Sequence, residues 1–103
     1  MRVLAEKSFE NDHWRITVSI KAVECTITIM DLREEPQPAE GDKEGKHFAS
    51  CKTLPKPQES REDNIKKTVQ AALALISMSA KKASDMNLFT LSDPVKSFIQ
   101  SWP

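Results

Sequence analysis

The clearest pattern in the chain is a strict alternation of hydrophobic and polar residues over positions 13–20 and again over 23–29. Alternation of this kind, rich in β-branched residues, is typical of strands that bury one face. A two-residue turn at 21–22 would place Ile20 opposite Val23 and Trp14 opposite Ile29, which keeps the hydrophobic side chains of both strands together. This turn lacks the Asn or Gly that tight hairpins favour, so a longer loop is an open alternative.

A weaker alternation predicts a first strand over residues 3–10. Asn11-Asp12 is a favourable turn sequence, and a tight turn there would pair Phe9 with Trp14. The same register points Lys7 toward the core. An edge strand tolerates this, because the long side chain can reach solvent at the rim.

Beyond the central hairpin, residues 33–46 hold three basic and five acidic residues and no hydrophobic side chain other than Ala39. Such a segment cannot bury itself, and we expect a flexible acidic loop. Residues 47–54 then predict a fourth strand. The Pro55-Lys56-Pro57 sequence predicts an extended exit from it, since a residue before proline avoids the helical region.

A long helix is expected over about residues 61–83. Ser60 and Asp63 approximate a capping box at its start, and Lys81 and Lys82 suit the negative end of the helix dipole. One stripe of the helix is assigned to the sheet and consists of Ile65, Val69, Ala72, Leu73, Ile76, Ala80 and Ala83.

A second, shorter helix is expected to begin at Ser92-Asp93-Pro94, with Ser92 as its cap. Its hydrophobic stripe has the spacing i, i+3, i+4 and i+7 and consists of Val95, Phe98, Ile99 and Trp102. Strands followed by helices predict an α+β fold, here an antiparallel four-stranded β-meander followed by one long and one short α-helix on one sheet face. We expect a single domain over 1–103.

The long helix carries a second apolar stripe at Ala71, Leu75 and Met78. Either the C-terminal helix packs against this stripe, or it binds a second copy or another protein. Trp102 has two interpretations as well: a buried anchor of the tail, or an aromatic side chain that contacts a partner.

The charge composition argues against a general polyanion binder. Fifteen basic and fifteen acidic residues give a formal net charge of zero in a chain of 11.6 kDa. The charges are nevertheless uneven, with −3 over residues 1–46 and +3 over 60–84. A nucleic-acid-binding module is therefore the alternative, and only Phe48 could supply a stacking ring on the polar sheet face. Its candidate residues are Arg15, Lys21, Lys52, Lys66 and Lys67.

No motif predicts catalysis or metal binding. The soft ligands His13, Cys25, His47 and Cys51 lie on three different predicted strands and do not converge. Both cysteines are interpreted as small core residues, so we expect no enzyme activity, no cofactor and no metal site.

The chain start favours a cytoplasmic location, since Glu6 and Lys7 interrupt any signal-peptide hydrophobic region. The longest apolar run, residues 71–76, is too short to span a bilayer. The hypothesis is that the chain is a small cytosolic interaction protein, which forms a homodimer and binds a protein partner. It would act as a regulator or inhibitor of a larger assembly, of the kind encoded by phages and mobile elements. The proposed binding residues are Leu75, Met78, Phe98 and Trp102.

Overall fold

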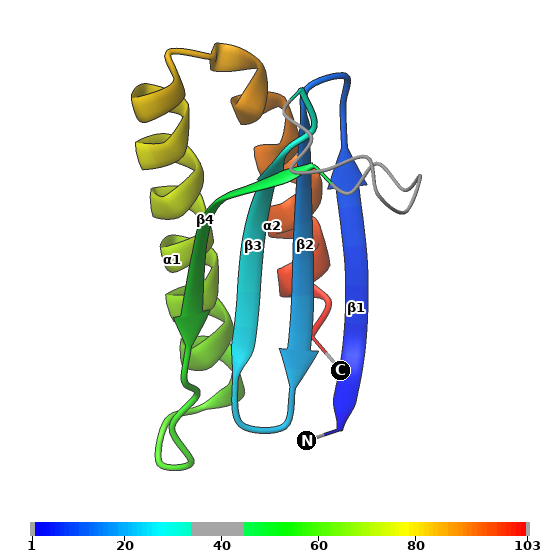
Figure 1. Cartoon of the computed structure of the whole chain (residues 1–103). Helices are drawn as coiled ribbons and strands as arrows, with labels where there is room; N and C mark the ends of the chain where they lie inside the picture. Colours follow the sequence, from blue (N-terminus) through cyan, green and yellow to red (C-terminus); the bar gives the residue numbers. More distant parts are fainter. Residues whose placement is uncertain (1, 34–44, 103) are drawn as a thin grey trace.

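The four strands form one antiparallel sheet in sequence order (Figure 1). The computed structural model describes residues 2–33 and 45–102. The strands are β1 (Val3–Glu10), β2 (Trp14–Lys21), β3 (Cys25–Asp31) and β4 (Lys46–Thr53). They are followed by α1 (Arg61–Ala83), the 3₁₀ helix η1 (Met86–Leu91) and α2 (Ser92–Gln100). This order confirms the predicted ββββαα fold, although η1 was not expected.

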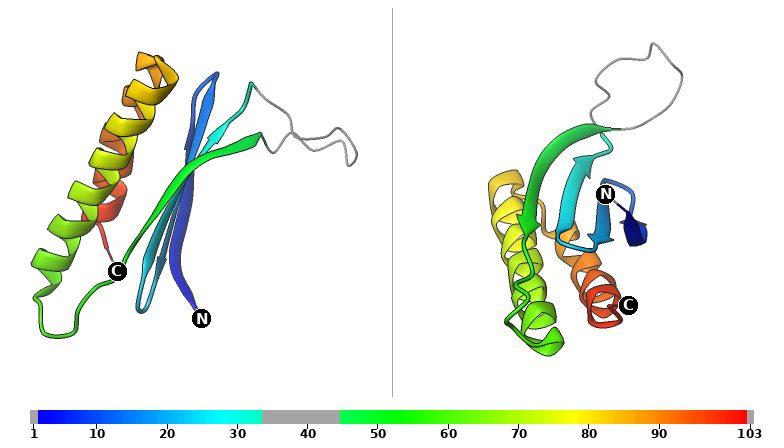
Figure 2. Two further views of the ribbon diagram at one scale, coloured as in Figure 1. Left: turned by 60° about the vertical axis from the view of Figure 1, so that its left-hand side comes forward. Right: turned by 90° about the horizontal axis from the view of Figure 1, so that it is seen from below.

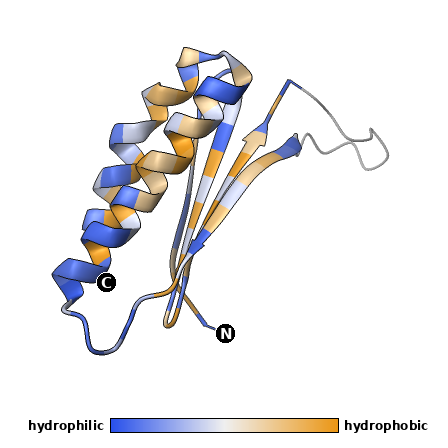
Figure 3. Cartoon of the chain, turned by 90° about the vertical axis from the view of Figure 1, so that its left-hand side faces the viewer, coloured by the Kyte–Doolittle hydropathy of each residue, from blue (hydrophilic) through white to orange (hydrophobic). Residues whose placement is uncertain are grey.

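Both helices cover the same face of the sheet, with α1 against β4 and α2 beneath the β1 side (Figure 2). The core lies between the two layers, and the alternating colours along the strands in Figure 3 follow the predicted pattern. Within the described residues, thirteen hydrophobic core side chains have no solvent exposure, among them Ala72 and Ala80 of α1. The other eleven are Trp14, Ile16, Val18, Ile20, Cys25, Ile27, Ile29, Ile76, Leu88, Val95 and Ile99. Along residues 2–33 and 45–102, no helix combines the length and hydrophobicity needed to cross a membrane.

The register predicted for the central hairpin is wrong by two residues. Ile20 pairs with Cys25 instead of Val23, because the connection is longer and the Lys21 amide donates to the Glu24 carbonyl at 2.8 Å. A shift of two residues keeps every strand side chain on its predicted face. Only Val23 changes, since it leaves the strand and is 55% exposed.

The register predicted for the first hairpin is also wrong by two residues, because Phe9 pairs with Ile16 instead of Trp14. The cause is the Asn11 side chain, whose Oδ1 accepts from the amides of His13 and Trp14 at 2.9 Å each. This local bonding holds a loop wider than two residues. Lys7 is exposed at the sheet edge, as the edge-strand interpretation requires.

The fourth strand contains a bulge that changes the direction of one aromatic ring. Ala49 pairs with Ile29 and His47 with Met30, so Phe48 is the extra residue between them. Its ring packs edge-on against Trp14 at a centroid distance of 5.0 Å. The prediction that Phe48 could stack on the polar sheet face is therefore wrong. The predicted acidic loop at 33–46 lies largely outside the described residues.

The bounds predicted for the long helix are confirmed, and Ser60 Oγ accepts from the Asp63 amide at 3.1 Å as a cap. The prediction that Ser92 caps the second helix is wrong. Ser92 is the first residue of α2, and its amide already donates to the Phe89 carbonyl in η1. Because η1 leads directly into α2, that amide has no need of a side-chain cap.

The second apolar stripe of α1 is not covered by α2. Lys82, on the same flank of α1 as Leu75 and Met78, reaches toward β4, with its Nζ 5.4 Å from the Phe48 ring centre. The other flank of α1, at Lys66 and Gln70, borders a groove shared with α2, and Met78 of the second stripe is 69% exposed. The interpretation that the C-terminal helix fills the second stripe is therefore wrong.

Candidate partner-binding site

The four residues predicted to bind a partner do not form one surface. Leu75 is half-buried against the core, while Met78, one turn further along α1, is 69% exposed. Phe98 belongs to α2 and packs edge-on against Phe9 at 5.9 Å. Trp102 is only 9% exposed and is part of the core. Its interpretation as a buried anchor therefore fits the structure, but one side of its surroundings is open.

That open side is a cleft of about 440 Å³, which we call the Trp102 cleft. It lies at the end of the molecule where the β2–β3 turn and the connection from β4 to α1 come together (Figure 1). Its apolar lining residues are Ala22, Val23, Pro55, Pro57 and Trp102. The lining thus combines one large aromatic residue with small and rigid apolar groups, a combination suited to holding a protein side chain.

The connection that forms one wall of the cleft is bonded to the first turns of α1. The Asn64 side chain accepts from the Lys56 amide at 3.1 Å and donates to the Lys56 carbonyl at 3.4 Å. Lys67 Nζ donates to the Leu54 carbonyl at 3.1 Å and forms an ion pair with Glu59 at 3.4 Å. These bonds hold the wall in place, so a ligand would find a preformed surface.

Exposed hydrophobic side chains are concentrated at the end of the sheet that holds this cleft. Seven large hydrophobic residues are clearly exposed in the described part of the chain, and four of them lie at this end of the sheet. Val3 is 44% exposed, Leu4 46%, Val23 55% and Leu54 60%. A concentration of exposed apolar groups beside a cleft is a common mark of a binding surface.

Polar groups at the cleft have unused hydrogen-bonding capacity. Lys56 and Arg61 line the cleft, and neither side chain has a carboxylate partner within residues 2–33 and 45–102. In the same part of the chain, the Trp102 indole N–H has no acceptor. All three groups are donors, so the cleft is suited to a partner that brings acceptors.

The structure separates the five residues of the nucleic-acid alternative. Arg15 lies 3.0 Å from Glu10 on the uncovered sheet face, and Lys67 of α1 pairs with Glu59 in the connection before that helix. Lys21 ends β2, whereas Lys66 borders the groove between the helices on the other side of the molecule.

Lys52 is paired as well, because its Nζ lies 3.2 Å from Glu24 Oε2. Its hydrogen bond and charge hold the pKa of Glu24 below the usual value, despite the opposing effect of desolvation. All six aromatic residues lie within the described segments, and none is placed on the outer sheet face. That face therefore offers paired charges and hydroxyl groups, not stacking rings.

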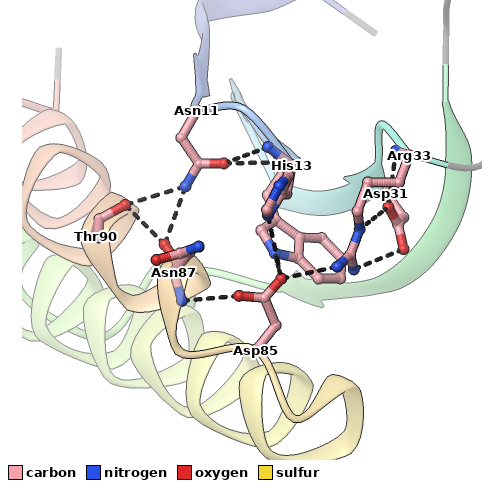
Figure 4. A network of polar contacts seen from close by, with 8 residues as sticks. Asn11, His13, Asp31, Arg33, Asp85, Asn87 and Thr90 are labelled. Carbon is pink, nitrogen blue, oxygen red and sulfur yellow. Dashed lines mark hydrogen bonds and ion pairs between the residues drawn. The ribbon is translucent and has the colours of Figure 1, made fainter.

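A polar network occupies the opposite end of the sheet (Figure 4). At its centre, the Asp85 carboxylate accepts from the Trp14 indole at 3.0 Å and from the Asn87 amide at 3.0 Å. It also lies 3.0 Å from an Arg33 nitrogen and 3.5 Å from His13 Nδ1. The network joins the start of η1 to β2 and to the end of β3.

The carboxylates of this network are stabilised in their charged form. Burial alone would raise the pKa of Asp85, but the hydrogen bonds from Asn87 and Trp14 and the charge of Arg33 outweigh it, and the pKa is lowered. The pKa of Asp31 is lowered in the same way, since the hydrogen bonds of Arg33 outweigh desolvation. Asp85 therefore serves as an anionic anchor between elements, while Asp31 holds the nearby Arg33 guanidinium in place.

Sequence reasoning missed Asp85, although a signal was present. Asp85 precedes η1, and its Oδ1 accepts from the Asn87 amide as a helix cap would. The signal was the position of Asp85 itself, since an aspartate just before a helical turn commonly accepts a hydrogen bond from an amide two residues later. Its contacts to Trp14 and Arg33 could not be found this way, because they join residues far apart in the chain.

The described segments contain neither an activated cysteine nor a cluster of metal ligands. Burial raises the pKa of the Cys25 thiol to about 12 and also raises that of Cys51, which keeps both protonated. No group of three or more His, Cys, Asp or Glu residues is placed to hold a metal ion within 2–33 and 45–102. His13 and Asp85 form the one His–carboxylate contact among the ion pairs of these residues.

Comparison with known proteins gives no relative: no family model matches the chain, and searches of curated proteins and of solved structures found no similar sequence or fold.

Proposed function

We propose that this chain is a non-enzymatic interaction protein that binds another protein at the Trp102 cleft. The observation that carries the proposal is the presence of Val3, Leu4, Val23 and Leu54, all exposed, at the end of the sheet that holds the preformed cleft, which Val23 also lines. Fully burying a side chain of this size is worth about 1.5–3 kcal/mol. A partner that covers these groups would therefore gain binding free energy without reorganising the cleft wall.

The proposed role is that of a cytoplasmic regulator or inhibitor, which acts by occupying a surface of a larger assembly. Self-association is one form that this binding can take, with a second copy as the partner. Light scattering on the purified protein separates the two forms, since a homodimer has twice the mass of the 11.6 kDa chain. The second stripe of α1 is a less suitable surface, because Leu75 already packs against the core.

Affinity capture with matched variants tests the proposal. The variant with Val23→Asp and Leu54→Asp places two charges at the cleft end of the sheet, and Met78→Asp places one charge on a similarly exposed side chain of α1. All three positions are exposed, so circular dichroism should show unchanged folding. We expect the cleft variant to lose the protein captured by the unmodified chain and Met78→Asp to retain it. Equal capture by all three proteins would refute the proposed surface.

Nucleic-acid binding is the alternative proposal, and the same experiment addresses it. Three of its five residues, Arg15, Lys52 and Lys67, are engaged in ion pairs, which is why protein binding is preferred. Nuclease treatment of the captured complex should leave the bound protein in place. Release of that protein by nuclease would favour the alternative.

A further inference from the structure

Next to the Trp102 cleft, the two helices border a groove of about 520 Å³. Ile65 and Val69 of α1 give it an apolar floor, and Gln70 and Gln100 face it from the two helices. Arg61 lines both the groove and the Trp102 cleft, so the two hollows meet at this side chain. A single bound segment could therefore contact both.

The charges along this combined surface are unbalanced. Lys56, Arg61, Lys66 and Lys96 line it, and none of these side chains has an ion-pair partner in the part of the chain that the structure describes. Among the described residues, two carboxylates line the same surface, Glu59 and Glu62. Glu59 is neutralised by Lys67, which leaves Glu62. Such a surplus on a protein of zero net charge favours an anionic partner here.

We infer that the partner contributes an acidic peptide segment with aliphatic side chains, which runs from the Trp102 cleft past Arg61 into the groove between α1 and α2. This inference rests on the proposed function and specifies the chemistry of the partner. Aliphatic groups would pack on Ile65, Val69 and the cleft walls, while carboxylates pair with the four cations. The indole N–H of Trp102 and the two glutamine amides can bond the peptide backbone.

A displayed library of random peptides about 12 residues long, selected on the whole protein, tests this inference. We expect the enriched peptides to combine an acidic excess with aliphatic residues. Arg61→Glu and Lys96→Glu should each weaken their binding about tenfold or more, as measured by fluorescence anisotropy. Lys81→Glu, at the far end of α1 and outside the groove, is the matched control and should change binding less than about twofold. Arg61→Glu should fold normally, since glutamate is favourable in the first turn of a helix.

The possible failures are distinguishable. Enriched peptides that are neutral or basic, and that lose binding with Val23→Asp and Leu54→Asp, would overturn the acidic chemistry and leave the proposed surface intact. Acidic peptides unaffected by Arg61→Glu and Lys96→Glu would also overturn the inference. An absence of enriched peptides, or binding unaffected by any of these substitutions, would count against both the inference and the proposed function.

Discussion

At the scale of single residues, the end of the sheet opposite the cleft is held by polar side chains that each join distant segments. Asn11 fixes the first hairpin through its Oδ1, and its Nδ2 donates to the Asn87 carbonyl and to Thr90 in η1. Asp85 bonds the Trp14 indole, while the Arg33 guanidinium lies 4.9 Å from the centre of that ring. These contacts fix the position of η1 against the sheet, which in turn directs α2 toward the cleft.

Replacing Asp85 with asparagine should therefore lower the thermal unfolding temperature at neutral pH. Because folding lowers the pKa of Asp85, its charge stabilises the protein above the unfolded value of 3.8, and this contribution is lost as the pH falls through and below it. The difference between the unmodified protein and Asp85→Asn should be largest near pH 7 and shrink below about pH 4. Tryptophan fluorescence during thermal unfolding measures the unfolding temperature of each protein at each pH.

The control for this experiment is Asp12→Asn, a matched change at an exposed residue of the first hairpin. Its unfolding temperature should follow that of the unmodified protein at every pH. A difference for Asp85→Asn that stays constant from neutral to acidic pH would contradict the electrostatic explanation.

At the scale of elements, sequence patterns predicted the features that depend on neighbouring residues, namely strand faces and helix bounds. Alternation identified the buried faces of β2 and β3, and the cap and helical period gave the bounds of α1. Turn lengths were missed because they depend on side-chain and backbone bonds within each loop, such as those of Asn11. For the candidate site, sequence reasoning singled out Trp102. It missed Val23 and Leu54, since their exposure depends on where β2–β3 pairing and β4 end.

The two serines at the predicted helix starts test this account of the elements. Ser60→Ala should destabilise the protein by about 1 kcal/mol, because it removes the acceptor for the Asp63 amide. Ser92→Ala should stay within about 0.5 kcal/mol, since its hydroxyl caps nothing in α2. Urea unfolding measures both free energies. A larger loss for Ser92→Ala than for Ser60→Ala would show that α2 begins as the sequence predicted.

At the scale of the whole molecule, the two ends of the sheet differ in chemistry. One end is closed by the Asp85 network, in which charges are paired and the Trp14 indole is bonded. The other end has exposed apolar residues, an indole without an acceptor in the described segments, and the cations Lys56 and Arg61. The zero net charge therefore conceals a localised positive surface beside apolar groups, which is the basis of the proposed partner binding.

Site-specific photo-crosslinking in cells of the native host tests this central claim most directly. A photoreactive amino acid replaces either Leu54 at the cleft end, 60% exposed, or Met78 on α1, 69% exposed. Because the two positions are similarly accessible, random collisions should label them equally. The proposal predicts a discrete protein adduct from position 54 that is absent from position 78. An adduct from position 78 alone, or no difference between the two positions, would contradict it.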